Sequence, residues 1–185
     1  MNKFFIVDAY ALIYRAYYAF INNPRFNSKG LNTSAIFGFV NFIDEILKKE
    51  NPTHIAVCFD PPMPSFRKQL YNEYKANRLK TPEDIKKSIP IIKSILNAFR
   101  ISFLEIDSYE ADDVAGSLAK KFANDSFNIF LYTSDKDYLQ LIDKNISVYK
   151  PKGKNNEHQV IDLSTFKQEY KIGRAHVWTP VTASY

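Results

Sequence analysis

Acidic residues gather in one short stretch of the chain, Y-E-A-D-D-V-A-G over residues 109–116. Glu110, Asp112 and Asp113 fall within four positions there, and the apolar residues that follow recur at helical spacing. The pattern places the three acids on the first turn of a helix, where the macrodipole favours negative charge. Glu110 and Asp113 are three positions apart and share a helix face, whereas Asp112 points elsewhere. Without further evidence, this stretch fits equally well an acidic turn that only caps its own helix.

Other acids fall at or just past the ends of apolar runs that predict β-strands. These acids are Asp8, Asp60, Asp135 and Asp137. The carboxyl ends of parallel strands meet at one edge of a sheet, and that edge carries the active site in open α/β folds. We therefore expect seven carboxylates to converge on one rim, which makes a purely capping role the weaker interpretation.

The acids can meet at one rim only if the predicted strands form a single sheet. The chain does alternate apolar runs with helical patterns. Strands are predicted at 4–7, 54–59, 101–105, 128–132 and 146–149. Helices are predicted at 10–20, from Thr33 or Ser34 to Asn51, from Thr81 onward with a kink or break at Pro90, after residue 109, and at 163–170. This alternation predicts an α/β fold, with a mostly parallel, doubly wound sheet and helices on both faces.

Seven carboxylates packed together repel one another, so several would have to be protonated at neutral pH. A divalent cation removes that problem, and an all-oxygen ligand set without His or Cys favours Mg²⁺ or Mn²⁺ over zinc. Two such ions about 4 Å apart can activate a water and stabilise both oxygens of a phosphoryl displacement. The acids thus predict metal-dependent phosphodiester chemistry.

A basic and aromatic segment occupies residues 61–80, after the second predicted strand. Its charged residues are Arg67, Lys68, Lys75, Arg78 and Lys80 against the single acid Glu73, and its aromatics are Phe66, Tyr71 and Tyr74. A solvated surface helix explains such a run, and so does a surface that contacts phosphates. Beside an acidic rim, the second interpretation points to a nuclease.

Composition restricts the alternatives. The chain has 185 residues, a net charge of +5 and one cysteine, as expected for one domain in a reducing cytoplasm. No apolar run approaches the roughly 20 residues that span a bilayer, so we expect no membrane partner. No glycine-rich phosphate loop is present, and the three scattered histidines are interpreted as structural or surface residues.

The motifs also resemble a known family, the N-terminal 5′-nuclease (5′→3′ exonuclease) domain of bacterial DNA polymerase I, a relative of the flap endonucleases. The resemblance extends from Asn2 to Lys171. It is carried by D-A-Y-A-L-I-Y-R-A-Y-Y-A-F (8–20), G-L-N-T-S-A-I-F-G-F (30–39), F-D-P-P-M-P-S-F-R (59–67), Y-N-E-Y-K-A-N-R (71–78), Y-E-A-D-D-V-A-G (109–116) and T-S-D-K-D-Y-L-Q-L (133–141). It implies a PIN-like, resolvase-like fold with a helical arch at about 61–80.

The resemblance implies roles for individual residues. The first catalytic metal would be held by Asp8, Asp60, Glu110 and Asp112, and the shared or second-metal group would be Asp113, Asp135 and Asp137, with the partition between the two left open. DNA contacts are implied for Arg15, Phe66, Arg67, Tyr74, Lys75 and Arg78. Lys75 and Arg78, three apart on a predicted helix, would both face the scissile phosphate as catalytic residues, and Tyr74 would stack on a base.

The implied function is removal of primers and flaps during replication and repair. The implied cofactor is two Mg²⁺ ions, with Mn²⁺ as an alternative, and the implied partners are 5′-flap, nicked or primer-containing DNA and a C-terminal polymerase region on a monomeric protein. Two other hypotheses stay open: a DNA-binding module with an inactive rim, and a PIN-like ribonuclease. The Y-K-A-N-R segment argues against the ribonuclease, because those compact enzymes lack a threaded arch.

The resemblance stops at Lys171. Family members continue with a helix–turn–helix element and two more metal-binding aspartates, whereas residues 172–185 read I-G-R-A-H-V-W-T-P-V-T-A-S-Y. We interpret this tail as a non-native segment translated from a sequencing adapter, and residues 1–171 as the N-terminal part of the exonuclease domain. On that interpretation we expect weak nuclease activity or none.

Overall fold

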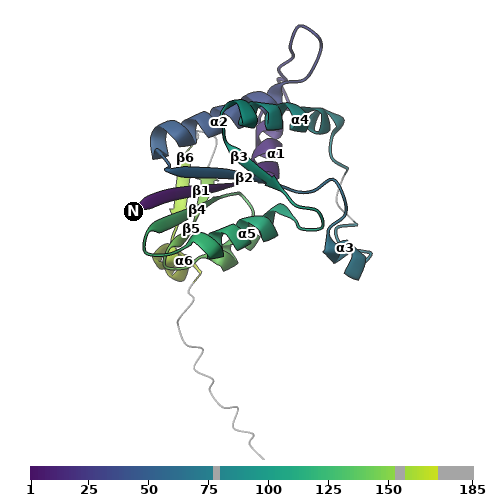
Figure 1. Ribbon diagram of the computed structural model, residues 1–185. Coiled ribbons are helices and arrows are strands. Elements are labelled where there is room, and N and C mark those ends of the chain that lie inside the picture. The colour runs from purple at the N-terminus through teal and green to yellow at the C-terminus, as the bar shows by residue number, and fades with distance from the viewer. Residues whose placement is uncertain (77–79, 153–156, 171–185) are drawn as a thin grey trace, which may run out of the picture.

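A six-stranded sheet with the order β3-β2-β1-β4-β5-β6 forms the centre of the computed structural model, which describes residues 1–76, 80–152 and 157–170 (Figure 1). The strands are β1 (Asn2–Asp8), β2 (His54–Phe59), β3 (Ser102–Glu105), β4 (Phe127–Tyr132), β5 (Ile146–Lys152) and β6 (Glu157–Ile161). Neighbouring strands run parallel, except that β5 and β6 pair antiparallel. The predicted mostly parallel sheet is confirmed, and the antiparallel β6 was not predicted.

The strand order turns around at β1. From β1 the chain builds outward through β2 and β3 on one side, and through β4, β5 and β6 on the other. Because consecutive connections leave this point in opposite directions, the carboxyl ends of β1 and β4 border a crevice of the kind that holds ligands in doubly wound folds. Asp8 ends β1, and Thr133 directly follows β4.

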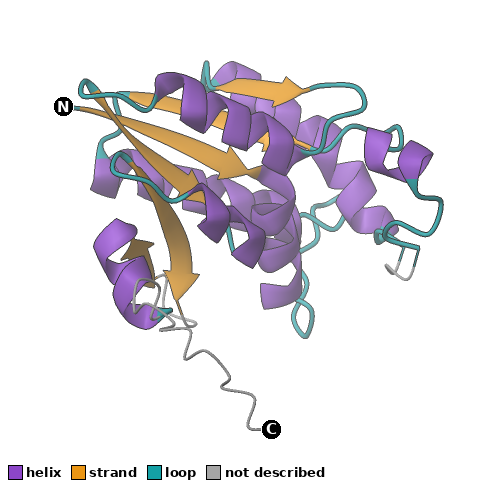
Figure 2. Ribbon diagram, turned by 90° about the horizontal axis from the view of Figure 1, so that it is seen from below, coloured by secondary structure: helices purple, strands orange, loops and turns teal. Residues whose placement is uncertain are grey.

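Helices cover both faces of the sheet, as predicted (Figure 2). One face carries α1 (Ala9–Ala19), α2 (Ser34–Glu50) and α4 (Glu83–Ala98), and the other carries α5 (Ala111–Phe122), the 3₁₀ helix η1 (Lys136–Leu141) and α6 (Leu163–Glu169). Side chains of β1 alternate between two buried clusters, with Phe5 and Val7 in the first and Phe4 and Ile6 in the second. Among the described residues, no helix is long and apolar enough to cross a membrane.

Two local predictions need correction. Of the predicted kink or break at Pro90, the break is wrong, since α4 continues through this residue. Pro90 lies on the exposed side of the helix, where water can bind the carbonyl that loses its partner. Thr33 occupies the position before α2 but does not cap it, since its hydroxyl donates to the carbonyl of Arg25 at 3.1 Å. The end of α2 at Asn51, which adopts φ 46°, is as predicted.

The predicted arch begins after β2 and is described as far as Ala76. It contains the short helix α3 (Phe66–Leu70), which lies beyond the carboxyl ends of the strands and is followed by turns (Figure 1). Lys75 lies in one of these turns with φ 57°, so the predicted helix that would carry Lys75 and Arg78 together is wrong at Lys75. Arg78 and the tail 172–185 lie outside the described residues.

Candidate active site

Asp8 is the central acid of the site and lies at the crevice between β1 and β4. Its carboxylate accepts hydrogen bonds from the Ala11 backbone N–H at 3.1 Å and from the Thr133 hydroxyl at 3.0 Å. Burial raises the pKa of Asp8 to about 6 despite these bonds, and the negative charges of Asp60 and Asp135 contribute to the rise. A cation at this position would remove the cost of the buried charge.

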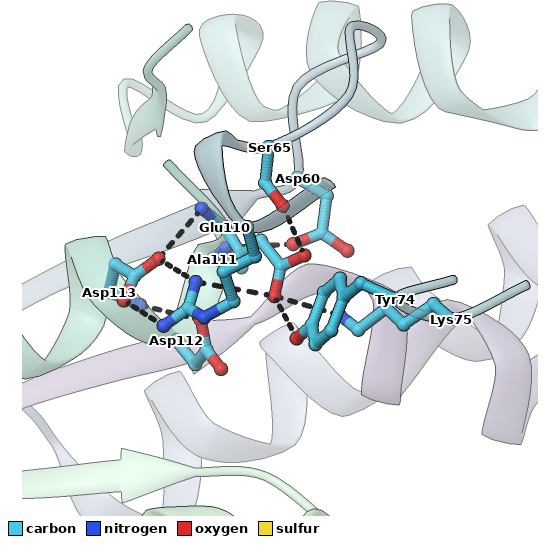
Figure 3. A network of polar contacts seen from close by, with 9 residues as sticks. Asp60, Ser65, Tyr74, Lys75, Glu110, Ala111, Asp112 and Asp113 are labelled. Atoms are coloured by element: carbon cyan, nitrogen blue, oxygen red, sulfur yellow. Dashed lines mark hydrogen bonds and ion pairs between the residues drawn. The ribbon is translucent and has the colours of Figure 1, made fainter. Parts of the chain in front are cut away.

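The first turn of α5 is tied to the end of β2. Asp60, which follows β2, accepts a hydrogen bond from the Ala111 backbone N–H at 2.7 Å (Figure 3). Asp113 accepts from the Glu110 backbone N–H at 3.1 Å, as in a capping box. Asp112 accepts from the backbone N–H of Asp113 at 2.7 Å, and burial raises the pKa of Asp112. The capping interpretation is therefore correct for Asp113. Asp113 caps its helix and also lies at the acidic rim.

The seven predicted acids are divided between two adjoining cavities. A cleft of about 1220 Å³ is lined by Asp8, Asp60, Glu110, Asp112 and Asp135. A second cavity of about 490 Å³ is lined by Asp112, Asp113 and Asp137. Asp112 borders both cavities. It was predicted to point away from Glu110 and Asp113, and it lies where the two groups of acids meet.

Two cations of the segment predicted to form the arch bind acids at the start of α5. The guanidinium of Arg67 pairs with both oxygens of Asp113 at 2.6 Å each, and its Nη1 lies 3.6 Å from Glu110. The ammonium of Lys75 lies 2.8 Å from the same Glu110 oxygen. The contact of Arg67 with both carboxylates agrees with the prediction that Glu110 and Asp113 share a helix face.

Glu110 is the most densely bonded acid of the site. It also accepts from the Ser65 hydroxyl at 2.9 Å and the Tyr74 hydroxyl at 3.1 Å (Figure 3). Burial alone would raise the pKa of Glu110, but the bonds from Lys75, Ser65 and Tyr74 lower it below its ordinary value. Ser65 was not among the predicted residues, and its only sequence signal is its place in the motif at 59–67.

The remaining predicted DNA-contact residues flank the acids. Phe66 packs on Tyr109 with ring centroids 5.7 Å apart and lies under the Arg67 guanidinium at 4.8 Å. Arg15 on α1 lines the large cleft, and its guanidinium lies 5.7 Å from the Phe42 ring centroid.

The large cleft is also lined by residues that the sequence analysis missed. Tyr10, Tyr14 and Tyr18 follow α1 at four-residue spacing and line the cleft, and the Tyr14 and Tyr18 rings stack at 6.3 Å. The signal was available, because three tyrosines at intervals of four lie on one helix face beside Arg15.

Tyr138 was quoted only as part of a motif, but it borders both cavities. Its side chain is 2% exposed, and its hydroxyl has no hydrogen-bond partner within the described ranges. Burial raises the pKa of the Tyr138 phenol, and the nearby groups of Asp8, Cys58 and Asp112 raise it further. The hydroxyl is therefore a protonated donor that lies close to the acids.

The donor set fits a hard divalent cation. Seven carboxylates supply only oxygen, and neither histidine nor cysteine lines either acidic cavity. In the part of the chain that the structure describes, no three His, Cys, Asp or Glu side chains are grouped closely enough to bind an ion directly. Mg²⁺ keeps several of its waters in proteins, so a hydrated ion does not need three side chains in direct contact with it.

Comparisons with known proteins agree with this arrangement. A family model described as "5'-3' exonuclease, N-terminal resolvase-like domain" matches residues 3–171. The 5'-3' exonuclease of Aquifex aeolicus is 40% identical over 151 residues, which are 82% of this chain and 52% of that protein. DNA polymerase I of Caldicellulosiruptor bescii is 44% identical over 147 residues, which are 79% of this chain and 17% of that protein. The chain thus spans about half of one relative and a smaller part of the other.

Solved structures show the same fold. A bacteriophage T5 D15 flap endonuclease, crystallised as a pseudo-enzyme-product complex with DNA and metal ions, superposes with a TM-score of 0.63 at 17% identity. The superposition covers 92% of this chain and 61% of the T5 chain. With the family match over residues 3–171, these findings establish that the chain belongs to the 5'-3' exonuclease family and contains its N-terminal resolvase-like domain.

Proposed function

We propose that this chain is part of a divalent-metal-dependent 5′→3′ exonuclease and flap endonuclease that hydrolyses phosphodiester bonds near the 5′ ends of DNA. The observation that carries the proposal is the meeting of two opposite charge sets, because seven carboxylates line two adjoining cavities while Arg67 and Lys75 reach them from the arch. An acidic site for cations beside cations that suit phosphates is what cleavage of a nucleic-acid backbone requires.

In this proposal the acids hold Mg²⁺ or Mn²⁺ ions, which activate water and stabilise the charge that develops at the phosphate. Asp8, Asp60, Glu110 and Asp112 form the first group of ligands. Asp113, Asp135 and Asp137 form the second or shared group. Thr133 and the Ala11 N–H orient Asp8, and the Ala111 N–H orients Asp60.

The arch residues act on the DNA. Lys75 and Arg67 would exchange their carboxylate partners for phosphate oxygens when a strand enters, because phosphate oxygens accept the same charge-assisted hydrogen bonds as a carboxylate. Arg78 would join Lys75 at the scissile phosphate, and Arg15, Phe66 and Tyr74 would contact the strand. The substrates are 5′ flaps and nicked or primer-containing duplexes, and the biological setting is primer removal by a monomer linked to a polymerase region in the bacterial cytoplasm.

A cleavage assay tests the proposal. Because we expect weak activity at best from the 185-residue chain, it is used in excess over a 5′-labelled flap DNA, where a slow reaction is still visible. It is expected to release short 5′ products slowly with Mg²⁺ or Mn²⁺ and none with EDTA. The Asp112→Asn variant is expected to lose at least about 100-fold of that rate, because Asp112 borders both cavities. Asp125→Asn is the matched control, since Asp125 is 92% exposed and lies outside the lining of either acidic cavity.

The same assay separates the alternatives. An inactive DNA-binding module would retain flap DNA in the presence of Ca²⁺ but give no metal-dependent product at any enzyme concentration. A ribonuclease would cleave a single-stranded RNA of the same sequence faster than the flap DNA. Either result would contradict the proposed activity while leaving the family membership intact.

A further inference from the structure

The hydroxyl of Tyr138 is a buried polar group that makes no hydrogen bond within the described residues which would explain its presence in the fold. Among the buried side-chain nitrogen and oxygen atoms of the described residues, it alone lacks a hydrogen-bond partner. Leaving a buried donor unpaired is unfavourable, so such groups in native proteins are normally paired with protein, water or a ligand. A phenylalanine would fill the same space without that cost, because the ring itself packs in the second buried cluster.

Other buried tyrosines in the sheet differ in this respect. The hydroxyl of Tyr149 donates to Glu50 at 2.8 Å, and the hydroxyl of Tyr132 lies 3.3 Å from Nε2 of His158. Both lie on the face of the sheet that α2 covers, in the first buried cluster. The unpaired hydroxyl therefore belongs specifically to the tyrosine that lies against the acids.

The position of Tyr138 explains what the hydroxyl would bind. Tyr138 and Asp112 are the two residues that line both acidic cavities. The neutral phenol can donate one hydrogen bond, which a carboxylate or a water molecule can accept. A hydrated Mg²⁺ or Mn²⁺ ion between Asp8, Asp60 and Asp112 would bring such a water to this wall.

We propose that Tyr138 is a positioning residue that donates a hydrogen bond to a water of the hydration shell of a divalent ion held by Asp8, Asp60 and Asp112. This inference rests on the proposed metal site. The donor would fix one water of the ion at the boundary between the two cavities. Partners of this kind, one step removed from the ion, commonly change metal affinity by about 10–100-fold.

The substitution Tyr138→Phe tests the inference, because it removes the hydroxyl and keeps the ring. Tyr132→Phe is the matched control, a buried tyrosine whose hydroxyl contacts His158 away from the acids. Mn²⁺ binding is measured by isothermal titration calorimetry on the whole chain, and thermal unfolding is followed with EDTA and with saturating Mn²⁺.

The two variants are expected to differ in Mn²⁺ affinity and in melting temperature. Tyr138→Phe should weaken Mn²⁺ binding about 10-fold, while its melting temperature in EDTA should rise by about 2 °C because an unpaired buried donor is gone. Tyr132→Phe should bind Mn²⁺ like the unmodified chain, and its melting temperature in EDTA should not rise. A purely structural role for the Tyr138 hydroxyl would instead lower the melting temperature in EDTA and leave Mn²⁺ binding unchanged.

Equal Mn²⁺ affinity of Tyr138→Phe and the unmodified chain would overturn the inference about Tyr138 and leave the metal site standing. The Asp112→Asn variant is expected to bind no Mn²⁺. If the unmodified chain also bound none, the proposed function would be overturned and this inference with it. The two failures are therefore distinguished by the unmodified chain alone.

Discussion

Arg67 and Asp113 form a two-pronged ion pair, in which each guanidinium nitrogen lies 2.6 Å from one carboxylate oxygen, across 46 positions of the chain. The pair joins the arch to the first turn of α5. Hydrogen bonds from Arg67 lower the pKa of Asp113, so the carboxylate stays ionised. Arg67 thus pairs with the same carboxylate that we propose binds a metal ion or one of its waters.

Removing Arg67 should have opposite effects on metal binding and on stability. Arg67→Ala is expected to tighten Mn²⁺ binding several-fold in the absence of DNA, because the ion no longer competes with a guanidinium for Asp113. It should also lower the free energy of unfolding by about 1 kcal/mol, since the pair is only partly buried. Calorimetric titration with Mn²⁺ and urea unfolding in EDTA measure the two changes.

Lys121→Ala is the control for that experiment, because it removes the same charge from an exposed side chain in the last turn of α5, outside the lining of the acidic cavities. It should leave Mn²⁺ affinity within about 2-fold, as expected for a screened surface charge. Weaker Mn²⁺ binding by Arg67→Ala would show that Arg67 supports the metal site rather than competing with the ion.

Lys75 should contribute one phosphate contact. The affinity for a 5′-flap DNA, measured in Ca²⁺ over a range of salt concentrations, is expected to fall linearly on logarithmic axes. Lys75→Ala should reduce that slope by about 1, whereas Lys144→Ala, at a side chain that is 80% exposed, should leave it unchanged. An unchanged slope for Lys75→Ala would mean that Lys75 keeps its Glu110 partner when DNA is bound.

The close contact between α1 and α2 depends on Gly38. A Cβ at this position would lie 2.5 Å from the Cβ of Ala16, so the two helices would have to move apart. Gly38→Ala is therefore expected to lower the free energy of unfolding by about 1–3 kcal/mol in urea denaturation. Because α1 begins directly after Asp8 and carries Arg15, DNA binding should weaken as well.

Gly116→Ala is the matched helix substitution. A Cβ there would lie 3.4 Å from the Leu141 methyl groups, which is ordinary contact. The change should raise stability by about 0.5–1 kcal/mol, because alanine favours the helix more than glycine does. Similar destabilisation by both substitutions would contradict the proposed role of helix approach at Gly38.

His158 should make the stability of the metal-free protein depend on pH. Burial lowers the pKa of His158 below the ordinary value of 6.5, so the unfolded chain binds a proton more readily than the folded one. The contribution of His158 to stability is therefore full above about pH 6.5, and it decreases as the pH falls from there toward the pKa of the folded state. Urea unfolding in EDTA at several pH values, with His158→Phe as the comparison, measures this: the loss between neutral and mildly acidic pH should be smaller in the variant.

The sequence by itself determined the five parallel strands, the longer helices that cover them and the set of acids. Apolar periodicity can be recognised from neighbouring residues alone. An acid that follows a parallel strand lies at the edge of the sheet that carries active sites, whatever the position of that strand in the sheet. Asp8, Asp60 and Asp135 could therefore be selected from their positions in the sequence alone. The basic segment at 61–80 was likewise visible in the sequence, and the resemblance added its interpretation as an arch.

Only the tertiary structure decided how these residues meet. The turn at Lys75, with φ 57°, directs this residue toward Glu110, and the ion pair of Arg67 with Asp113 depends on where α3 packs. Neither contact has a local sequence signal, because Lys75 and Glu110 are 35 positions apart and Arg67 and Asp113 are 46 apart. The division of the acids into two cavities, with Asp112 at their boundary, likewise follows from packing. The unpaired hydroxyl of Tyr138 could be recognised only once every neighbour was in place, because hydrogen-bond satisfaction is a property of the folded interior.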